Sequence, residues 1–284
     1  MNNREKKRYR LLALDLDGTA LRSDGSLSEY SKRAFMDAHE AGIHIVLSSG
    51  RSFRSLPEEI LSLPCMEYAI TSNGAVIYDI NNKKQLQVFY LKEEAVEELL
   101  RIAEEAKVTA EGFINGVPYA DFDYVEHPEK FGAGLRAAAY VRRTRRPVSD
   151  IFSFLRSHRR ELESLDLITC DPMKKEQLRA WIQREVRDIY LTSSTPMLLE
   201  VSDAHGGKAS GLRFLAEYLG IPKKETAAFG NAENDLDMMV WAGQGVAVAN
   251  APEDVRAQAD EVTASNDEDG VGHWIRRYLE ERKS

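Results

Sequence analysis

The sequence predicts an α/β protein in which a Rossmann-like core with a parallel sheet is split around an inserted α+β domain. Short apolar runs alternate with amphipathic stretches in the first 80 residues, and this alternation returns in the last third of the chain. Between them lie long helices and hairpins. A length of 284 residues suits two domains, since one domain usually has ~100–200 residues. We therefore expect a core of residues 1–84 and 194–284 and an inserted domain of residues 85–193.

The first part of the core carries clear signals for the ends of its elements. Ser28 is a suitable N-cap for the first helix, and Gly42 is a stop signal. A second helix is expected to end before Pro64, and Asn81-Asn82 forms the turn of a hairpin. We expect strands at residues 10–16, 44–48 and 68–72, helices at 28–41 and 52–63, and a hairpin of 75–79 with 85–90.

The inserted domain begins with a strongly periodic helix, and Asn115-Gly116 is a strong signal for a hairpin turn. We expect helices at residues 92–107, 149–163 and 173–188 and strands at 108–114, 117–122, 165–170 and 189–193. The core is expected to resume with strands at 197–202, 226–229 and 245–249 and helices at 209–219 and 233–242.

The composition excludes several classes of protein. The formal charge of −8, from 46 acidic and 38 basic residues, argues against a nucleic-acid-binding protein. The two cysteines, Cys65 and Cys170, fit neither a disulfide framework nor a zinc site. No apolar run approaches the ~18 residues of a membrane span. We therefore expect a soluble cytoplasmic protein with no membrane partner.

Two carboxylates follow the first predicted strand, in the segment Asp15-Leu16-Asp17-Gly18-Thr19. Residues two apart in an extended chain point to the same side, so both project beyond the end of the strand, where open α/β sheets bind ligands. Two such carboxylates repel each other unless a cation lies between them, and hard oxygen ligands suit Mg²⁺. An ordinary turn with an N-cap is the alternative interpretation.

Three further polar clusters follow other predicted strands. Ser48-Ser49-Gly50-Arg51 opens a helix, where a hydroxyl and free N–H groups can hold a phosphate oxygen. Gly206-Gly207-Lys208 can bring an ammonium group to a phosphate. The segment from Gly230 to Asp235 adds a polar, carboxylate-bearing loop. Each cluster alone could be a cap or a surface loop, but together they point to one site.

In this order the four clusters resemble the motifs of the haloacid dehalogenase superfamily of phosphohydrolases, over nearly the whole chain. Asp15 to Thr19 is similar to the first motif, Ser49 to Arg51 to the second, Lys208 to the third, and Gly230 to Asp235 with Met238 to the fourth. Ser72-Asn73-Gly74-Ala75 and Asn266 to Val271 resemble the Cof-like subgroup, whose large α+β cap lies between the second and third motifs. The inserted domain lies in that interval, so the resemblance implies that it is a substrate-selecting cap.

The resemblance also implies roles for individual residues. Asp15 is the expected nucleophile, which forms an aspartyl-phosphate, and Asp17 the expected general acid and base. Lys208 is expected to offset developing negative charge. The expected phosphate-binding residues are Leu16, Ser49, Gly50, Lys208 and Asn234. Mg²⁺ is the implied cofactor, and its expected ligands are Asp15, the backbone carbonyl of Asp17 and Asn231, with Asp235 as an anchor for the metal and its waters.

Asn231 departs from the family pattern, in which an aspartate directly follows the glycine of the fourth motif. An amide oxygen can still coordinate Mg²⁺ but brings no charge. We therefore expect weaker metal binding, or carboxylate ligation by Glu233 or Asp235 instead.

The sequence thus predicts a Mg²⁺-dependent phosphatase acting on small phosphorylated metabolites, with sugar phosphates as the expected substrates. A phosphomutase is one alternative, and a phosphate-ligand sensor or regulatory protein with weak or no hydrolysis because of Asn231 is another. The sequence does not give the oligomeric state. The candidate substrate-selecting residues lie near Asn115, near Tyr119 and in the run from Arg142 to Arg146.

A run of arginines also stands out in the inserted domain. We interpret it as a solvated face paired with Glu161, Glu163 and Asp166, with a cationic rim for a phosphorylated substrate as the alternative. Its members are Arg136, Arg142, Arg143, Arg145, Arg146, Arg156, Arg159 and Arg160.

Overall fold

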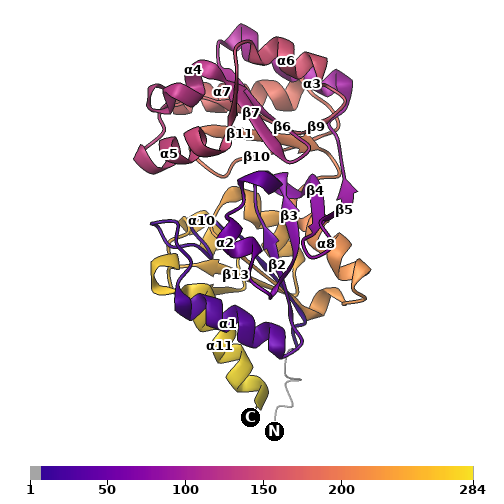
Figure 1. Ribbon diagram of the computed structural model, residues 1–284, viewed down its shortest axis with the longest axis vertical. Coiled ribbons are helices and arrows are strands. Elements are labelled where there is room, and N and C mark those ends of the chain that lie inside the picture. The colour runs from indigo at the N-terminus through magenta and orange to yellow at the C-terminus, as the bar shows by residue number, and fades with distance from the viewer. Residues whose placement is uncertain (1–7, 284) are drawn as a thin grey trace.

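The computed structural model describes residues 8–283, which form two domains, each built on its own sheet (Figure 1). The core sheet has the strand order β14-β13-β12-β1-β2-β3-β4-β5, and the cap sheet has the order β10-β11-β9-β6-β7-β8. Neighbouring strands from β14 to β3 are parallel, whereas β4 and β5 are added antiparallel. The cap sheet is antiparallel except where β7 meets β8. The predicted parallel α/β core with an inserted α+β domain is therefore confirmed.

The core elements before the cap are β1 (Leu11–Leu14), α1 (Glu29–Glu40), β2 (His44–Ser48), η1 (Phe53–Ser55), α2 (Glu58–Leu61), β3 (Met66–Thr71), η2 (Ser72–Gly74), β4 (Val76–Asp79) and β5 (Lys84–Val88). Those after it are α8 (Lys208–Tyr218), η4 (Lys223–Glu225), β12 (Thr226–Gly230), η5 (Glu233–Asp235), α9 (Leu236–Trp241), β13 (Gln244–Val248), α10 (Glu253–Arg256), β14 (Glu261–Thr263), η6 (Asn266–Glu268) and α11 (Gly270–Lys283).

The cap elements are α3 (Glu93–Ala106), β6 (Thr109–Ile114), β7 (Val117–Asp121), α4 (Phe122–Glu126), η3 (Pro128–Phe131), α5 (Leu135–Thr144), β8 (Arg146–Val148), α6 (Ile151–Ser157), β9 (Leu162–Ile168), α7 (Pro172–Glu185), β10 (Ile189–Thr192) and β11 (Leu198–Asp203).

Local sequence explains the best-predicted elements of the core. All four residues of β1 are buried, as expected of a parallel strand covered on both faces. The helix α1 begins after Ser28, whose hydroxyl accepts a hydrogen bond from the N–H of Ser31 at 3.0 Å. It packs its buried face, which includes Phe35, into the core beside α11 (Figure 1). None of the helices within residues 8–283 is long and apolar enough to cross a membrane.

In the cap, the helices α3, α6 and α7 cover the sheet face that is turned away from the core (Figure 1). The apolar stripe of α3 is buried there, which explains its strong periodicity. The hairpin of β6 and β7 turns at Asn115 and Gly116, whose φ angles are 50° and 73°. Both residues therefore adopt the left-handed conformation that a two-residue hairpin turn requires.

The helix expected at residues 52–63 is wrong. This segment contains the short helices η1 and α2, separated by extended backbone at Leu56 and Pro57. Pro57 lacks an N–H and disfavours a helical conformation in the residue before it, so one continuous helix cannot form.

The helix expected at residues 149–163 is too long, and β9 starts at Leu162 rather than at residue 165. The helix α6 ends at Ser157, and a turn at residues 158–160 leads from it to β9. The helices α5 and α11 and the strands β8 and β14 were not predicted.

The strand expected at residues 197–202 exists as β11, but it belongs to the cap sheet, where it pairs with β10 and β9. Its residues alternate between the apolar cap core, which contains Leu199 and Val201, and polar positions such as Glu200. That pattern is typical of an antiparallel strand whose two faces have different surroundings. Conversely, β5 was expected mostly within the inserted domain, but it pairs with β4 in the core sheet. Sheet membership therefore divides the chain after residue 88 and after residue 203, not at 84 and 193.

Candidate active site

The site begins where β1 ends. Asp15 is 5% exposed, and its Oδ1 accepts a hydrogen bond from Nζ of Lys208 at 2.7 Å. The same ammonium donates to Oδ1 of Asp235 at 2.6 Å, and both Lys208 and Asp235 are fully buried. Burial and the neighbouring Asp235 raise the pKa of Asp15 to about 7 in spite of Lys208, while the two carboxylates raise the pKa of Lys208. Negative charge therefore exceeds positive charge at this point, which favours a further cation.

Asp17 faces away from this buried group. Its carboxylate accepts two hydrogen bonds from the guanidinium of Arg51, at 2.6 and 2.7 Å, and its side chain is 57% exposed. The backbone turns directly after Asp17, at Gly18, where φ is +79° and a Cβ would lie 2.6 Å from the Asn231 carboxamide. Only glycine fits at this position.

A hydrogen-bond network joins the second motif to the fourth motif and to the cap. The hydroxyl of Ser49 accepts from the N–H of Arg51 at 3.1 Å, and the Ser49 carbonyl oxygen accepts from the N–H of Asn73 at 3.2 Å. Asn234 donates its amide to Oδ1 of Asn73 at 2.9 Å, and Asn73 donates to Oε1 of Glu200 in the cap at 3.0 Å. Asn73 is buried and has a φ of 49°, and its side chain is held by Asn234 of the core and Glu200 of the cap.

The Asn231 carboxamide shows whether these residues fit Mg²⁺. In one of its two orientations, the carboxamide places its nitrogen 3.0 Å from the hydroxyl of Thr19. The nitrogen then also donates to Oδ2 of Asp15 at 3.2 Å and to the backbone carbonyl oxygen of Asp17 at 3.1 Å. The three expected metal ligands therefore lie together, because Asp15 and the Asp17 carbonyl oxygen both contact the carboxamide of Asn231. Within residues 8–283 no group of three or more His, Cys, Asp or Glu side chains could hold a metal. A set of one carboxylate and carbonyl oxygens, completed by water and phosphate, still fits Mg²⁺.

The two alternative carboxylate ligands are both engaged elsewhere. Glu233 forms a two-pronged ion pair with Arg179 of the cap, at 2.8 and 3.0 Å. Asp235 accepts from Lys208 with one oxygen and from the N–H groups of Asn231 and Ala232 with the other. Asp235 thus holds the loop of the fourth motif in place.

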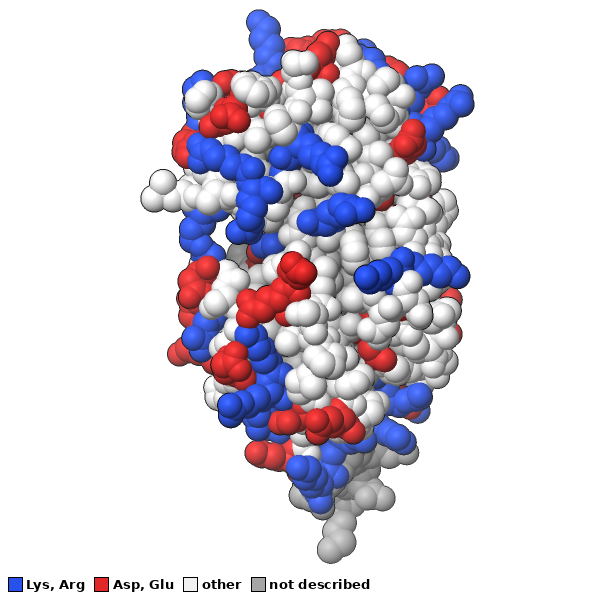
Figure 2. Space-filling model, viewed as in Figure 1, with Lys and Arg blue, Asp and Glu red and all other residues white. Residues whose placement is uncertain are grey.

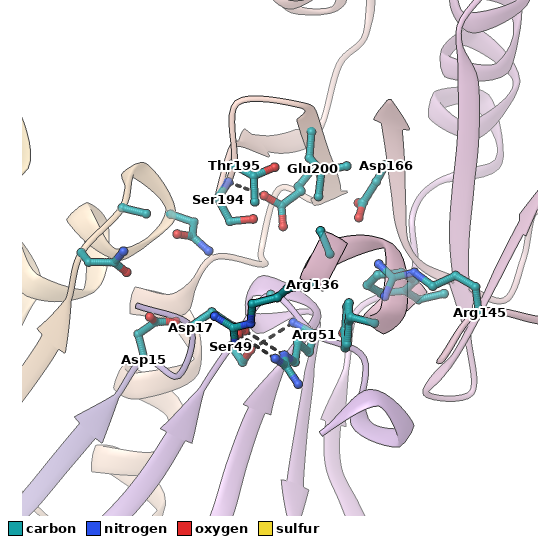
Figure 3. Close-up of a pocket in the computed structure, with 18 residues that line it drawn as sticks. Asp15, Asp17, Ser49, Arg51, Arg136, Arg145, Asp166, Ser194, Thr195 and Glu200 are labelled. Carbon is teal, nitrogen blue, oxygen red and sulfur yellow. Dashed lines mark hydrogen bonds and ion pairs between the residues drawn. The ribbon is translucent and has the colours of Figure 1, made fainter. Parts of the chain in front are cut away.

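A cavity of about 340 Å³ lies between the core and the cap. From the core it is lined by Asp15, Asp17, Ser49, Gly50, Arg51, Asn231, Ala232 and Asn234, and from the cap by Phe113, Arg136, Ala137, Tyr140, Arg145, Asp166, Ser194, Thr195, Leu198 and Glu200. Figure 3 shows Asp166, Ser194, Thr195 and Glu200 across this space from Asp15, Asp17 and Ser49. The cavity is large enough for a small ligand.

The cavity includes most of the predicted site residues. Leu16, Lys208 and Asp235 do not line it, because Leu16 is packed in the hydrophobic core and the other two lie behind Asp15. Of the candidate substrate-selecting residues, Arg145 lines the cavity, whereas Asn115, Tyr119 and Arg142 do not. Phe113, two residues before Asn115, lines the cavity, which agrees with the expectation of a substrate-selecting residue near Asn115.

Sequence reasoning assigned no role to several residues of the site. They are Arg51, Asn73, Tyr140 and Glu200, whereas Arg136 and Asp166 were expected only as a member and a partner of the arginine run. Arg51 and Asn73 stand inside quoted motifs, and polar residues at alternate positions of β9 and β11 were the available signal for Asp166 and Glu200.

The arginine run of the cap is mostly neutralised, but by other carboxylates than expected. Arg142 pairs with Glu129, Arg145 with Glu111, and the group of Arg156, Arg159 and Arg160 with Glu93, Glu97 and Glu104. Glu163 and Asp166 are buried in β9 and pair with none of them. Figure 2 shows basic side chains gathered over α5, above acidic ones near α2. Arg136 on α5 lines the cavity, so the run contributes to its rim.

Comparisons with known proteins agree with this geometry. The model of the haloacid dehalogenase-like hydrolase family matches residues 12–275. The phosphatase YwpJ of Bacillus subtilis is 32% identical, over 95% of this chain and 100% of its own length. The 5-amino-6-(5-phospho-D-ribitylamino)uracil phosphatase YcsE of the same organism is 28% identical, over 97% and 98%. A structure of a superfamily phosphatase from Bacteroides thetaiotaomicron has a TM-score of 0.80 at 26% identity, over 98% of each chain. The predicted family is therefore confirmed, and the chain is an enzyme that belongs to the haloacid dehalogenase-like hydrolase family.

Proposed function

We propose that the protein is a Mg²⁺-dependent phosphatase that hydrolyses small phosphomonoesters, with sugar or sugar-alcohol phosphates as substrates, through an aspartyl-phosphate on Asp15. The observation that carries this proposal is that Asp15 lines the cavity between core and cap, with Lys208 behind it, while Asp17 lines the same cavity and is held by Arg51. The name of YwpJ supports a phosphatase, and the name of YcsE, which specifies a phosphorylated ribityl group, supports the substrate class.

The residues present can carry both halves of the reaction. A carboxylate oxygen of Asp15 forms a bond to phosphorus as the bond to the ester oxygen breaks, and Asp17 gives a proton to the leaving alkoxide. Asp17 then takes a proton from water, which attacks phosphorus and releases phosphate and free Asp15. Ser49, the Gly50 backbone and Asn234 line the cavity where the phosphoryl oxygens would lie.

Arg51 and Lys208 hold different residues in this mechanism. Lys208 keeps its ammonium between Asp15 and Asp235, so it orients the nucleophile and offsets the charge of the site. Arg51 donates two hydrogen bonds to the side chain of Asp17 and so fixes the orientation of the expected acid–base group. Mg²⁺ would be held by Asp15, the Asp17 carbonyl and Asn231, and when bound it would neutralise charge on the phosphoryl group.

A phosphate-binding protein without turnover is the second candidate, because the amide of Asn231 can donate to the same oxygens that would hold the metal. Phosphate release from p-nitrophenyl phosphate and a panel of sugar phosphates, with and without Mg²⁺, separates the two. The proposal expects Mg²⁺-dependent release that the Asp15→Asn variant lacks. Absence of release with Mg²⁺, Mn²⁺ or Co²⁺, while phosphate still binds, would favour the binding protein. Release that persists in Asp15→Asn would overturn the assignment of the nucleophile.

A further inference from the structure

Three carboxylates lie side by side on the face of the cap sheet that is turned toward the core. Asp166 of β9 is directly opposite Glu111 of β6 on one side and opposite Glu200 of β11 on the other. All three are buried, with exposed fractions of 0% for Glu111, 1% for Asp166 and 4% for Glu200. Like charges at directly opposed positions destabilise a sheet, so each carboxylate needs its own compensation.

Two of the three are compensated by the protein itself. Both oxygens of Glu111 accept hydrogen bonds from the guanidinium of Arg145, at 2.7 and 2.8 Å. Glu200 accepts from the Asn73 amide with one oxygen and from the N–H of Ser194 with the other.

Asp166 is the carboxyl whose hydrogen bonds are left incomplete. Its Oδ1 accepts from the hydroxyl of Ser164 at 2.9 Å, but Oδ2 takes part in no hydrogen bond with residues 8–283, and no cation of that range forms an ion pair with it. Burial and the two adjacent carboxylates hold the pKa of Asp166 well above its usual range. Its Oδ2 is therefore an oxygen that still lacks a hydrogen-bonding partner among the residues that the structure describes and is available to a ligand.

This carboxyl faces the cavity. Asp166 lines it together with Ser49 and Asn234, and Figure 3 shows its side chain directed from the cap into the space above the core residues. A buried polar group without a partner costs free energy, so a ligand that completes its hydrogen bonds gains affinity. The lining also contains the apolar side chains of Phe113 and Leu198.

The charge of the surroundings selects the kind of ligand group. Arg51 and Arg145, which line the same cavity, are paired with Asp17 and Glu111, whereas Arg136 lines it without forming an ion pair within residues 8–283. An ammonium group would meet the guanidinium of Arg136, whereas a neutral hydroxyl can hydrogen-bond to Oδ2 of Asp166 without that repulsion. The geometry thus favours a hydroxyl.

We propose that Asp166 binds a hydroxyl group of the leaving alcohol, so that the enzyme selects phosphates of polyhydroxylated alcohols over aryl phosphates and over amino-alcohol phosphates. This inference rests on the proposed phosphatase function and extends it from the phosphoryl group to the part of the substrate that reaches the cap. Asp166 is a specificity-determining residue and takes no part in the chemical steps.

The test compares Asp166→Leu, which removes the hydrogen bonds, with Asp166→Asn, which keeps one acceptor and one donor in the same shape. The substrates are p-nitrophenyl phosphate, ribose 5-phosphate, glucose 6-phosphate, sorbitol 6-phosphate and glucosamine 6-phosphate, together with a deoxy analogue of whichever polyol phosphate has the highest kcat/KM. The p-nitrophenyl ester has no hydroxyl for Asp166 to bind, so it is the internal control for folding and for the chemical steps.

We expect Asp166→Leu to lower kcat/KM for the best polyol phosphate by roughly 10-fold to 100-fold, mainly through KM. The same variant is expected to leave the p-nitrophenyl ester unchanged and to have no further effect on the deoxy analogue. Asp166→Asn is expected to retain most of the wild-type kcat/KM, as a neutral hydrogen-bonding group should.

Four results would overturn the proposal. They are an unchanged kcat/KM for the best polyol phosphate in Asp166→Leu, an equal loss on the p-nitrophenyl ester, a preference for glucosamine 6-phosphate with Asp166→Asn as damaging as Asp166→Leu, and a preference of the wild type for the aryl ester over every polyol phosphate. Failure of the phosphatase function itself would look different, because the wild type would then release no phosphate from any substrate.

Discussion

Arg51 of the core holds the carboxylate of Asp17 with two hydrogen bonds while its guanidinium lies 4.5 Å from the ring centre of Tyr140 in the cap. A second arginine, Arg145, lies 4.7 Å from the same ring and is fixed by Glu111. The orientation of the expected acid–base group is therefore connected to the position of the cap through one aromatic side chain.

The substitution Tyr140→Leu tests this connection. Cation–π contacts contribute ~0.5–2 kcal/mol each, so we expect KM to rise roughly 3-fold to 10-fold with a smaller change in kcat. The measurement is steady-state kinetics with the best phosphomonoester. Tyr140→Phe keeps the ring and is the matched control, with near wild-type KM. Equal effects of Leu and Phe would show that the hydroxyl, not the ring, carries the contact.

Asn231→Asp places a carboxylate beside Oδ2 of Asp15 and the Asp17 carbonyl. With EDTA we expect a lower unfolding temperature than in the parent, because three oxygen acceptors then face one another. With Mg²⁺ we expect a larger stabilisation and a half-saturating concentration lower by roughly 10-fold, since the site gains a charged ligand. Thermal unfolding and Mg²⁺ titration of turnover measure the two effects. If the half-saturating Mg²⁺ concentration does not fall, Asn231 does not limit metal binding.

Lys208→Met leaves Asp15 and Asp235 as neighbouring buried carboxylates without their shared cation. Removing one partner of a buried ion pair costs about 3–5 kcal/mol, and loss of a charge-stabilising group lowers kcat by at least ~10³-fold. Urea unfolding and kcat measure these effects. Lys32→Met is the control, because Lys32 also contacts two carboxylates but at the surface. An equal loss of stability in both variants would contradict the special role of the buried ammonium.

Glu163, which lies outside the cavity, is expected to make the stability of the protein depend on pH. Burial raises its pKa to about 7, although the N–H of Gly116 donates to both of its oxygens. The folded protein therefore binds this proton more tightly than the unfolded chain, so stability falls as the pH rises from 4.5 to 7 and is constant above that range.

Glu163→Gln removes the proton uptake but keeps an acceptor for Gly116. We expect the variant to be more stable than the parent at pH 8 by on the order of 2–3 kcal/mol and closer to it at pH 5. Urea unfolding at both pH values measures the difference. Glu161→Gln changes an exposed position of the same segment and is expected to show no such dependence. A pH-independent difference for Glu163→Gln would contradict the raised pKa.

The sequence was most informative where a rule acts over neighbouring residues. The cap of α1 at Ser28 and the turn at Asn115-Gly116 depend on local conformation alone, and both were predicted. The prediction of one helix at residues 52–63 was wrong because it gave more weight to the pattern of apolar residues than to Pro57. In the structure the missing N–H of Pro57 interrupts the helix. The assignment of β11 to the wrong sheet has another cause, since strand pairing is not encoded in any local pattern.

The same division applies to the site. Asp15, Asp17 and Lys208 stand in compact motifs, so the sequence indicated them before their contacts were known. Asn73 and Glu200 form a hydrogen bond although they are 127 residues apart in the chain. Contacts of that kind, like the one between Arg51 and Tyr140, depend on how the cap docks on the core, which neither hydrophobic period nor motif spacing determines.

The two chain crossings between the sheets have a consequence for protein engineering. Phe89 donates its N–H to a core residue and Leu91 to a cap residue, so the outgoing crossing spans only these positions. On the return, Ala204 is bonded to the cap and Gly207 to the core, and the ring of His205 stacks on Phe89 at 5.6 Å. A transplanted cap from a relative must therefore be spliced at these two adjacent junctions, with both aromatic rings kept together. A splice at residues 84 and 194 would separate β5 from the core sheet and leave β11 without its own partners, so such a chimera would break both sheets.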